Sequence, residues 1–143
     1  MTEYLTIEES QKLIDYGLNP NNASKVAWQE LYDNDWQELS DYDKKVSWRS
    51  GIMNKSDVLK SGRFETHDIF TFGDLYDILP KRIEDNNKML CAANILITDD
   101  TYCVLSYMYS DNSSLVTFGP NNLISVVKDA VIWCLKNGYI ESK

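Results

Sequence analysis

The pattern of apolar and polar residues begins with a helical period near the N-terminus. Apolar side chains recur at roughly helical spacing at Ile7, Leu13 and Ile14. Thr6 and Glu9 form a capping box, in which each side chain can accept a hydrogen bond from the other residue's backbone N–H. Gly17 provides the left-handed residue that commonly ends a helix. The pattern therefore predicts a first helix between Thr6 and Gly17.

A second apolar stripe follows a turn at residues 19–22. Its members also fit a helical period, which predicts a second short helix with Ala23, Val26, Ala27 and Leu31 on its apolar side. Residues 33–68 show no clear period, and Gly51 and Gly62 interrupt them. We expect this segment to be irregular and charged, with only short helical turns.

The stretch IFTFGDLYDILPKRI, residues 69–83, has a marked start and stop. Thr71 and Asp74 have the spacing of a capping box, and Phe70 can pack against Leu75 as a hydrophobic staple. Pro80 disfavours a helical conformation at the residue before it. These signals predict a helix of about two turns that needs tertiary packing to be stable.

The period then changes to alternation in residues 89–98 and 101–109, with a third alternating segment at 114–118. If Asp99 and Asp100 are the central turn residues of a hairpin, paired positions sum to 199 and Cys91 and Cys103 point to opposite faces. On that register neither face of the hairpin is polar. We therefore expect an antiparallel sheet that is covered on both sides and has no Cys91–Cys103 disulfide.

The last helix is predicted from residue 123 onward, with Asn121 or Asn122 as its cap and Gly138 at its end. Its polar residues form one narrow stripe, and even Ile132 falls within that stripe. So wide an apolar surface predicts a helix that is central or lies at an interface. The fold class that follows is α+β, a three-stranded antiparallel meander packed with N- and C-terminal helices in a single domain spanning residues 1–143.

Charge is unevenly distributed along this acidic chain of net charge −8. Residues 1–43 carry ten acidic and two basic residues, a local −8, whereas residues 44–63 carry six basic and one acidic residue, a local +5. An acidic chain repels nucleic acid at long range, so general nucleic-acid binding is not expected. The N-terminus lacks a signal-peptide pattern and no apolar run is long enough for a bilayer, which predicts a cytoplasmic protein without a membrane partner.

Residues that carry chemistry are sparse. His67 is the single histidine, and Cys91, Cys103 and Cys134 lie in apolar runs that predict core positions. Phosphate-binding, metalloprotease and nucleophile-elbow motifs are absent. Acidic pairs such as Asp99 and Asp100, or Asp33 and Asp35, favour solvated turns over a metal site. We therefore expect no catalytic residue, no metal and no cofactor.

The basic segment 44–63 and the tryptophans are the candidate partner contacts. The basic segment with Trp48 in it favours neutralisation of the neighbouring acidic residues over phosphate binding. Tryptophan and arginine are enriched at interface hot spots, although tryptophan is more often found in a core. The residues we predict as partner contacts are Trp28, Trp36, Trp48, Arg49 and Ile132.

The phrases FTFGDLYDILP and AVIWCLKNGYI, together with the order of the predicted elements, resemble small proteins of bacterial phages and prophages. The resemblance covers about half the chain and leaves residues 33–68 without a counterpart. It implies a mobile-element setting and brings no activity and no site residues.

Three functions are therefore compared. The leading hypothesis is a non-catalytic protein–protein interaction module that binds another protein or a second copy of itself as a homodimer, because an apolar sheet and helix need more cover than a small chain offers. The first alternative is an acidic decoy of a nucleic-acid-binding partner. The second alternative is a small hydrolase that pairs a cysteine with His67.

Overall fold

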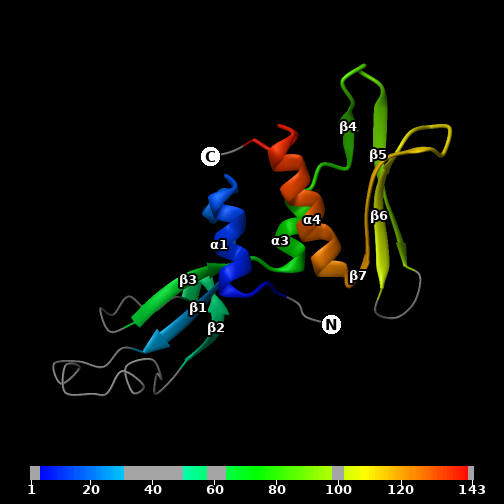
Figure 1. Ribbon diagram of the computed structural model, residues 1–143. Coiled ribbons are helices and arrows are strands. Elements are labelled where there is room, and N and C mark those ends of the chain that lie inside the picture. Colours follow the sequence, from blue (N-terminus) through cyan, green and yellow to red (C-terminus); the bar gives the residue numbers. More distant parts are fainter. Residues whose placement is uncertain (1–3, 31–49, 58–63, 98–101, 142–143) are drawn as a thin grey trace.

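The computed structural model describes residues 4–30, 50–57, 64–97 and 102–141 (Figure 1). The described residues form α-helices, antiparallel strands and two short 3₁₀ turns. In chain order the elements are α1 (Ile7–Asp15), η1 (Pro20–Asn22), β1 (Lys25–Glu30), β2 (Ser50–Asn54), η3 (Lys55–Asp57), β3 (Phe64–Ile69), α3 (Phe72–Ile78), β4 (Arg82–Glu84), β5 (Leu90–Ile97), β6 (Cys103–Met108), β7 (Ser114–Asn121) and α4 (Leu123–Lys136). The fold class is α+β, as predicted, with one three-stranded and one four-stranded sheet.

Helix α1 confirms the first predicted helix and both of its ends. The Glu9 N–H donates to Thr6 Oγ1 and the Thr6 N–H donates to Glu9 Oε1, each at 3.1 Å. Gly17 has a φ of 112°, and the Leu18 N–H reaches back to the Leu13 carbonyl at 3.0 Å. This is the left-handed C-terminal arrangement that glycine permits without steric cost.

The predicted second helix is wrong, because residues 25–30 form β1, the central strand of the sheet β2–β1–β3. Val26 is buried there and pairs with Met53 on one side and Asp68 on the other. An apolar stripe of only four residues is compatible with a helix or a strand. Here the neighbouring strands supply backbone hydrogen bonds that stabilise the extended conformation. Leu31, the last residue of the predicted stripe, lies outside the described residues.

Both neighbours of β1 lie in the segment predicted to be irregular, so that prediction is wrong for residues 50–54 and 64–68, which form β2 and most of β3. The 3₁₀ turn η3 agrees with the short helical turns expected there. Residues 33–49 and 58–63 lie outside the described residues. The strands of this sheet are short, and their polar residues hide the alternation from a single-sequence pattern.

Helix α3 confirms the prediction for residues 69–83. The Asp74 N–H donates to Thr71 Oγ1 at 3.1 Å, and the Thr71 N–H donates to Asp74 Oδ2 at 2.9 Å. Leu79, which precedes Pro80, is extended with a ψ of 122° and ends the helix. Asp74 Oδ2 also accepts from the N–H and the hydroxyl of Ser24, each at 2.9 Å, so one carboxylate fastens the start of β1 to the helix.

The four-stranded sheet has the order β4–β5–β6–β7, so the predicted meander of β5, β6 and β7 is present and β4 extends it. The predicted register is wrong by one residue, because Ala93 pairs with Tyr107 and Ile95 with Leu105, positions that sum to 200. An even sum places odd-numbered residues of both strands on one face. Cys91 and Cys103 therefore lie on the same face, contrary to the prediction, and both thiols are buried and free.

Helix α4 covers that odd-numbered face and lies between the four-stranded sheet and α1 (Figure 1). Asn122 is its cap, accepting from the Ser125 N–H at 3.0 Å, and Gly138 has a φ of 78°. Its side chains form the centre of the core, which confirms the predicted central helix; the buried members are Ile124, Val126, Val127, Ala130, Val131, Cys134 and Leu135. Lys128 joins α4 to α1 through Glu9 at 3.1 Å.

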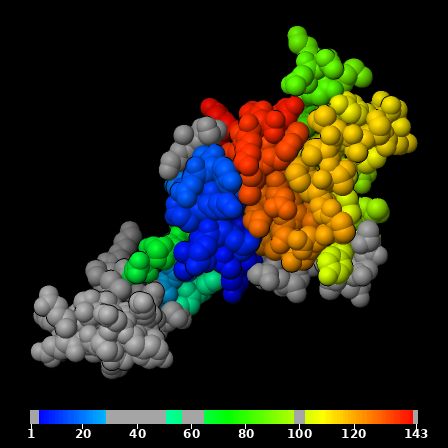
Figure 2. Space-filling view, in the orientation of Figure 1, coloured from blue at the N-terminus to red at the C-terminus, as the bar shows by residue number. Residues whose placement is uncertain are grey.

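The space-filling view shows that α1, α4 and β7 pack without a gap on the face presented there, whereas the hairpin of β4 and β5 projects at one end (Figure 2). Among the described residues, no helix has the length and apolar character needed to cross a membrane.

Candidate functional site

The side of the four-stranded sheet that faces away from α4 is open. We call it the open face; it consists of the even-numbered residues Arg82, Glu84, Leu90, Ala92, Asn94, Leu96, Val104, Ser106 and Met108, together with Thr117 of β7. Leu90 is 55% exposed and Leu96 61% exposed. The prediction that both faces of the sheet are covered is therefore wrong for the described residues, since α4 covers one side only.

A polar row crosses the middle of the open face. Asn94 pairs with Ser106, and Ser106 pairs with Thr117, so three polar side chains line up across three strands. The Ser106 and Thr117 hydroxyls lie 3.0 Å apart and share a hydrogen bond. Asn94 lies opposite Ser106 because paired positions sum to 200 and not to the predicted 199. The polar row divides the open face into two apolar areas.

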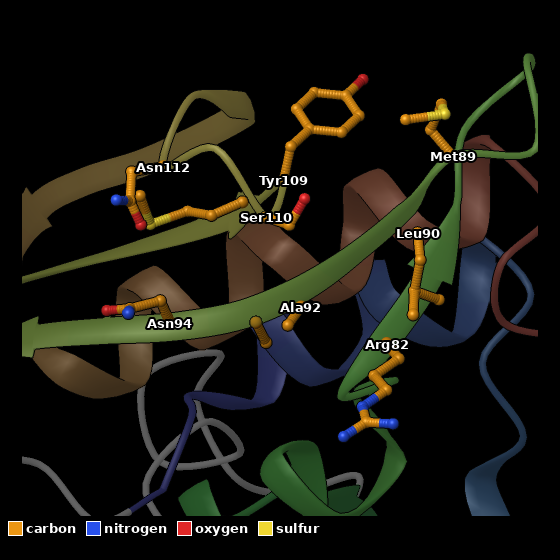
Figure 3. Close-up of a pocket in the computed structure, with 10 residues that line it drawn as sticks. Arg82, Met89, Leu90, Ala92, Asn94, Tyr109, Ser110 and Asn112 are labelled. Atoms are coloured by element: carbon orange, nitrogen blue, oxygen red, sulfur yellow. The ribbon is translucent and has the colours of Figure 1, made fainter.

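One apolar area contains Leu96 and Val104, which pair with each other next to the segment 98–101. The other contains Ala92 and Met108 and lies beside a hollow of about 660 Å³ (Figure 3). Figure 3 shows β5 running past this hollow, with Leu90 and Met89 toward one end and Asn94 toward the other. The lining is Arg82, Met89, Leu90, Ala92, Ala93, Asn94, Met108, Tyr109, Ser110 and Asn112.

The rim of the hollow is held by the turn between β4 and β5. Asp85 accepts from the N–H groups of Asn87 and Met89, both at 2.8 Å, and the Tyr109 hydroxyl donates to its second oxygen at 2.7 Å. The hydrogen bond from Tyr109 lowers the pKa of Asp85, and the same bond raises the pKa of Tyr109 to about 12. The two groups therefore stay as carboxylate and phenol across the physiological range and fix the end of β6 against the turn.

Arg82 is the cation of this hollow. It lies on β4 opposite Ala92, and among the described residues it has no ion-pair partner. The other polar residues that line the hollow, Asn94, Tyr109, Ser110 and Asn112, carry neutral amides and hydroxyls. The hollow therefore offers one positive charge and several hydrogen-bonding groups beside apolar walls, which is the composition of a protein-contact surface more than of an enclosed ligand site.

The predicted partner contacts are only partly within the described residues. Trp28 lies half-buried in β1 against Gly51, where an added Cβ would come within 3.2 Å of the indole nitrogen. Ile132 is half-buried on α4 and packs against the core. Neither residue lies on the open face. Trp36, Trp48 and Arg49 lie outside the described residues, and so do most of the basic residues of 44–63.

Lys55 is the one basic residue of 44–63 that the structure describes. Its ammonium group lies 3.0 Å from Asp68 and donates to the Pro20 carbonyl at 2.8 Å. This residue therefore has internal partners on β3 and η1. The predicted neutralisation of residues 30–43 by the basic segment stays a prediction, because those acids are not described.

The groups considered for catalysis do not form a site among the described residues. His67 lies on β3 with Nε2 at 3.2 Å from Glu65 Oε1, whereas the three thiols are buried beneath the other sheet. Burial raises the pKa of each thiol, so the reactive thiolate is scarce at neutral pH. The described residues contain no group of three potential metal ligands. Asp33, Asp35, Asp99 and Asp100 lie outside the described residues.

Sequence reasoning missed the open face because it placed the wrong residues opposite one another. The available signal was the alignment of Asn94 with Ser106, which appears only when the pairing sum is 200. Compared with protein-family models, with curated proteins and with solved structures, the chain gives no match.

Proposed function

We propose that the protein is a non-catalytic protein–protein interaction module that binds through the open face of its four-stranded sheet. The observation that carries the proposal is the exposure of two large apolar side chains of this face, Leu90 at 55% and Leu96 at 61%. Met89 and Ile97, their neighbours in sequence, are also more than half exposed. Single exposed apolar residues are normal on a protein surface, but an uncovered sheet face with two apolar areas is typical of a contact site.

The energetics favour a partner. Covering a large apolar side chain that is half exposed contributes roughly 1 kcal/mol. Leu90 and Leu96 together therefore offer about 2 kcal/mol before ordering costs. The hollow adds one positive charge, that of Arg82. The polar row of Asn94, Ser106 and Thr117 supplies hydrogen-bonding groups that can fix the orientation of a partner.

A matched pair of variants tests the proposal. Leu90→Asp places a charge in the open face, whereas Ile7→Asp places the same charge at an exposed apolar residue in the first turn of α1, where an acid is tolerated. Binding to proteins of the native host is measured by affinity capture with quantitative mass spectrometry. The proposal expects one set of captured proteins to be lost with Leu90→Asp and retained with Ile7→Asp. Identical capture by both variants and the parent chain, with no self-association, contradicts it.

The acidic-decoy alternative has less support among the described residues. Glu9, one of the acidic residues in 1–43, is paired with Lys128, so its charge is already neutralised within the chain. The likeness to phage and prophage proteins suggests the setting in which such a module would act. It names no partner.

A further inference from the structure

The outer edge of β5 is paired along only half its length. Strand β4 pairs with Leu90, Cys91 and Ala92, and the last bond of this edge runs from the Ala93 N–H to the Lys81 carbonyl at 2.8 Å. In an antiparallel strand, alternate residues direct both backbone groups to the same side. Ala93 bonds toward β4, so Ile95 and Ile97 also direct their N–H and C=O groups to this outer edge. No described element pairs with them there.

The free edge coincides with the most exposed apolar side chains. Leu96 is 61% exposed and Ile97 69% exposed, the highest values among the large apolar residues that the structure describes. No charged residue occurs between Met89 and Ile97. Proteins usually protect an edge with charge or proline, because a bare edge invites another strand.

Three other edge strands in the described structure are protected in this way, among them β4 with Arg82 and Glu84. Strand β7 contains Pro120, which has no N–H to offer. Strand β3 carries Glu65 and Asp68. The edge strand β2 (Ser50–Asn54) also lacks charge and proline, but its Ile52 is only 38% exposed. Among the described strands, the segment Ile95–Ile97 is therefore the unprotected edge with the most exposed apolar side chains. It has the chemistry of a strand-pairing site.

We propose that this edge pairs with the same edge of a second copy of the chain, about a two-fold axis that passes beside Leu96. The proposal rests on the proposed function and adds to it a second contact, at the edge of the same sheet, whose partner is another copy of the chain. In the antiparallel pairing, Ile95 lies opposite Ile97 of the second copy, and Leu96 lies opposite Leu96. Each of the two Ile95–Ile97 pairs exchanges two hydrogen bonds, which gives about four across the axis.

The register follows from which backbone groups are free. A two-fold pairing centred on Ile95 would place Ala93 opposite Ile97, but the Ala93 N–H is already bonded to Lys81. A pairing centred on Ile97 would leave Ile95 without a partner among the described residues. The pairing centred on Leu96 uses both free residues and displaces no existing bond. A second copy fits because the donors and acceptors of this edge complement themselves.

The contact is small, so the dimer should be weak. It covers the side chains around Leu96 and Ile97 of each copy, well below the roughly 1,200 Å² of a standard stable interface, which indicates a dissociation constant on the order of 10 µM. Each copy carries a net charge of −8 and the contact itself is uncharged. Added salt screens the repulsion between copies and should therefore strengthen the dimer.

Sedimentation velocity of the full chain at increasing concentration tests the proposal, with two substitutions on the same strand. Leu96→Lys places like charges opposite each other at the axis and should raise the dissociation constant on the order of 100-fold. Leu90→Lys adds the same charge to the same face, away from the axis, and should leave dimerisation within about threefold of the parent. Mixing Leu96→Lys with Leu96→Glu should restore a dimer that neither variant forms alone.

A disulfide gives an independent readout. Residues opposite each other in a non-hydrogen-bonded pair have Cα atoms about 4.5 Å apart, within the range that a disulfide spans. Leu96→Cys should therefore form a covalent dimer under mild oxidation, and Leu90→Cys should not. A parent chain that stays monomeric up to about 500 µM overturns the dimer but leaves the open face as a site for another protein. A dimer that is equally sensitive to both lysine substitutions, or that is not crosslinked through Leu96→Cys, overturns the edge pairing and retains the interaction function.

Discussion

Replacing Asp74 by alanine tests how the three-stranded sheet is fastened to the rest of the fold. The Asp74 carboxylate accepts three hydrogen bonds at 2.9 Å, from the Thr71 N–H and from the N–H and hydroxyl of Ser24. Loss of the cap bond costs about 1 kcal/mol. Loss of the bonds from Ser24, which is exposed and can turn to water, costs about 1 kcal/mol more. The free energy of unfolding should therefore fall by about 2 kcal/mol.

Urea unfolding followed by tryptophan fluorescence and circular dichroism is the assay. With a slope of about 1.5 kcal/mol per molar urea, the midpoint should move down by about 1.3 M without a change of slope. The matched control is Asp77→Ala, which removes an exposed acid from the same helix and should move the midpoint by less than about 0.3 M. Equal shifts for the two variants, or no shift for Asp74→Ala, would refute the reasoning.

Three further predictions concern the core, the helix contact and the thiols. Tyr107→Phe removes the hydroxyl that donates to the Pro80 carbonyl at 2.7 Å, and calorimetry should show a melting temperature lower by about 4 °C, whereas an unchanged temperature would mean that the bond contributes nothing. Burial pushes the pKa of Glu9 up, but the Thr6 N–H and Lys128 outweigh it and hold that pKa below its usual value. The stabilisation by ionised Glu9 is therefore present above about pH 4.5 and is lost as the pH falls through the lower folded pKa. Between about pH 5 and 3 the urea midpoint should depend less on pH in Glu9→Gln than in the parent chain. The same pH dependence of the midpoint in both proteins would count against the pairing. The native thiols should react with iodoacetamide at least about 100-fold more slowly in the folded chain than in urea, and one fast thiol would revive the hydrolase alternative.

The helix ends could be predicted from the sequence because their causes are local. Thr6, Thr71 and Asn122 each bond to a backbone group three residues away, and Gly17 and Gly138 supply left-handed conformations at a fixed offset. None of these interactions depends on a distant part of the chain. The sequence pattern is therefore sufficient for them.

The strands that depend on distant partners could not be predicted in the same way. The segment 25–30 is extended because β2 and β3 flank it, and its three apolar residues do not by themselves distinguish a strand from a helix. The three-residue strand β4 gives too short an alternation to detect, and it exists through its pairing with Leu90, Cys91 and Ala92. In both β1 and β4 the extended conformation depends on pairing with strands that are distant or only weakly marked in the sequence.

The open face escaped prediction for a related reason. When the register of a hairpin shifts by one residue, side chains of the two strands that shared one face of the sheet point to opposite faces. The sum of 199 assumed that Asp99 and Asp100 form a two-residue turn, whereas the pairing of Ile97 with Cys103 leaves five residues between the paired strands. The exposed Leu96 and the polar row of Asn94 and Ser106 follow from that difference.

Hydrogen exchange of individual amides, measured by NMR at low and high protein concentration, tests the central claim most directly. The Ile95 and Ile97 amides should exchange quickly in dilute protein and become protected as the concentration rises, because the second copy then occupies the edge. The Ala93 amide, already bonded to Lys81, should remain protected at every concentration and serves as the reference. Ile95 and Ile97 amides that exchange equally fast at all concentrations would contradict the account.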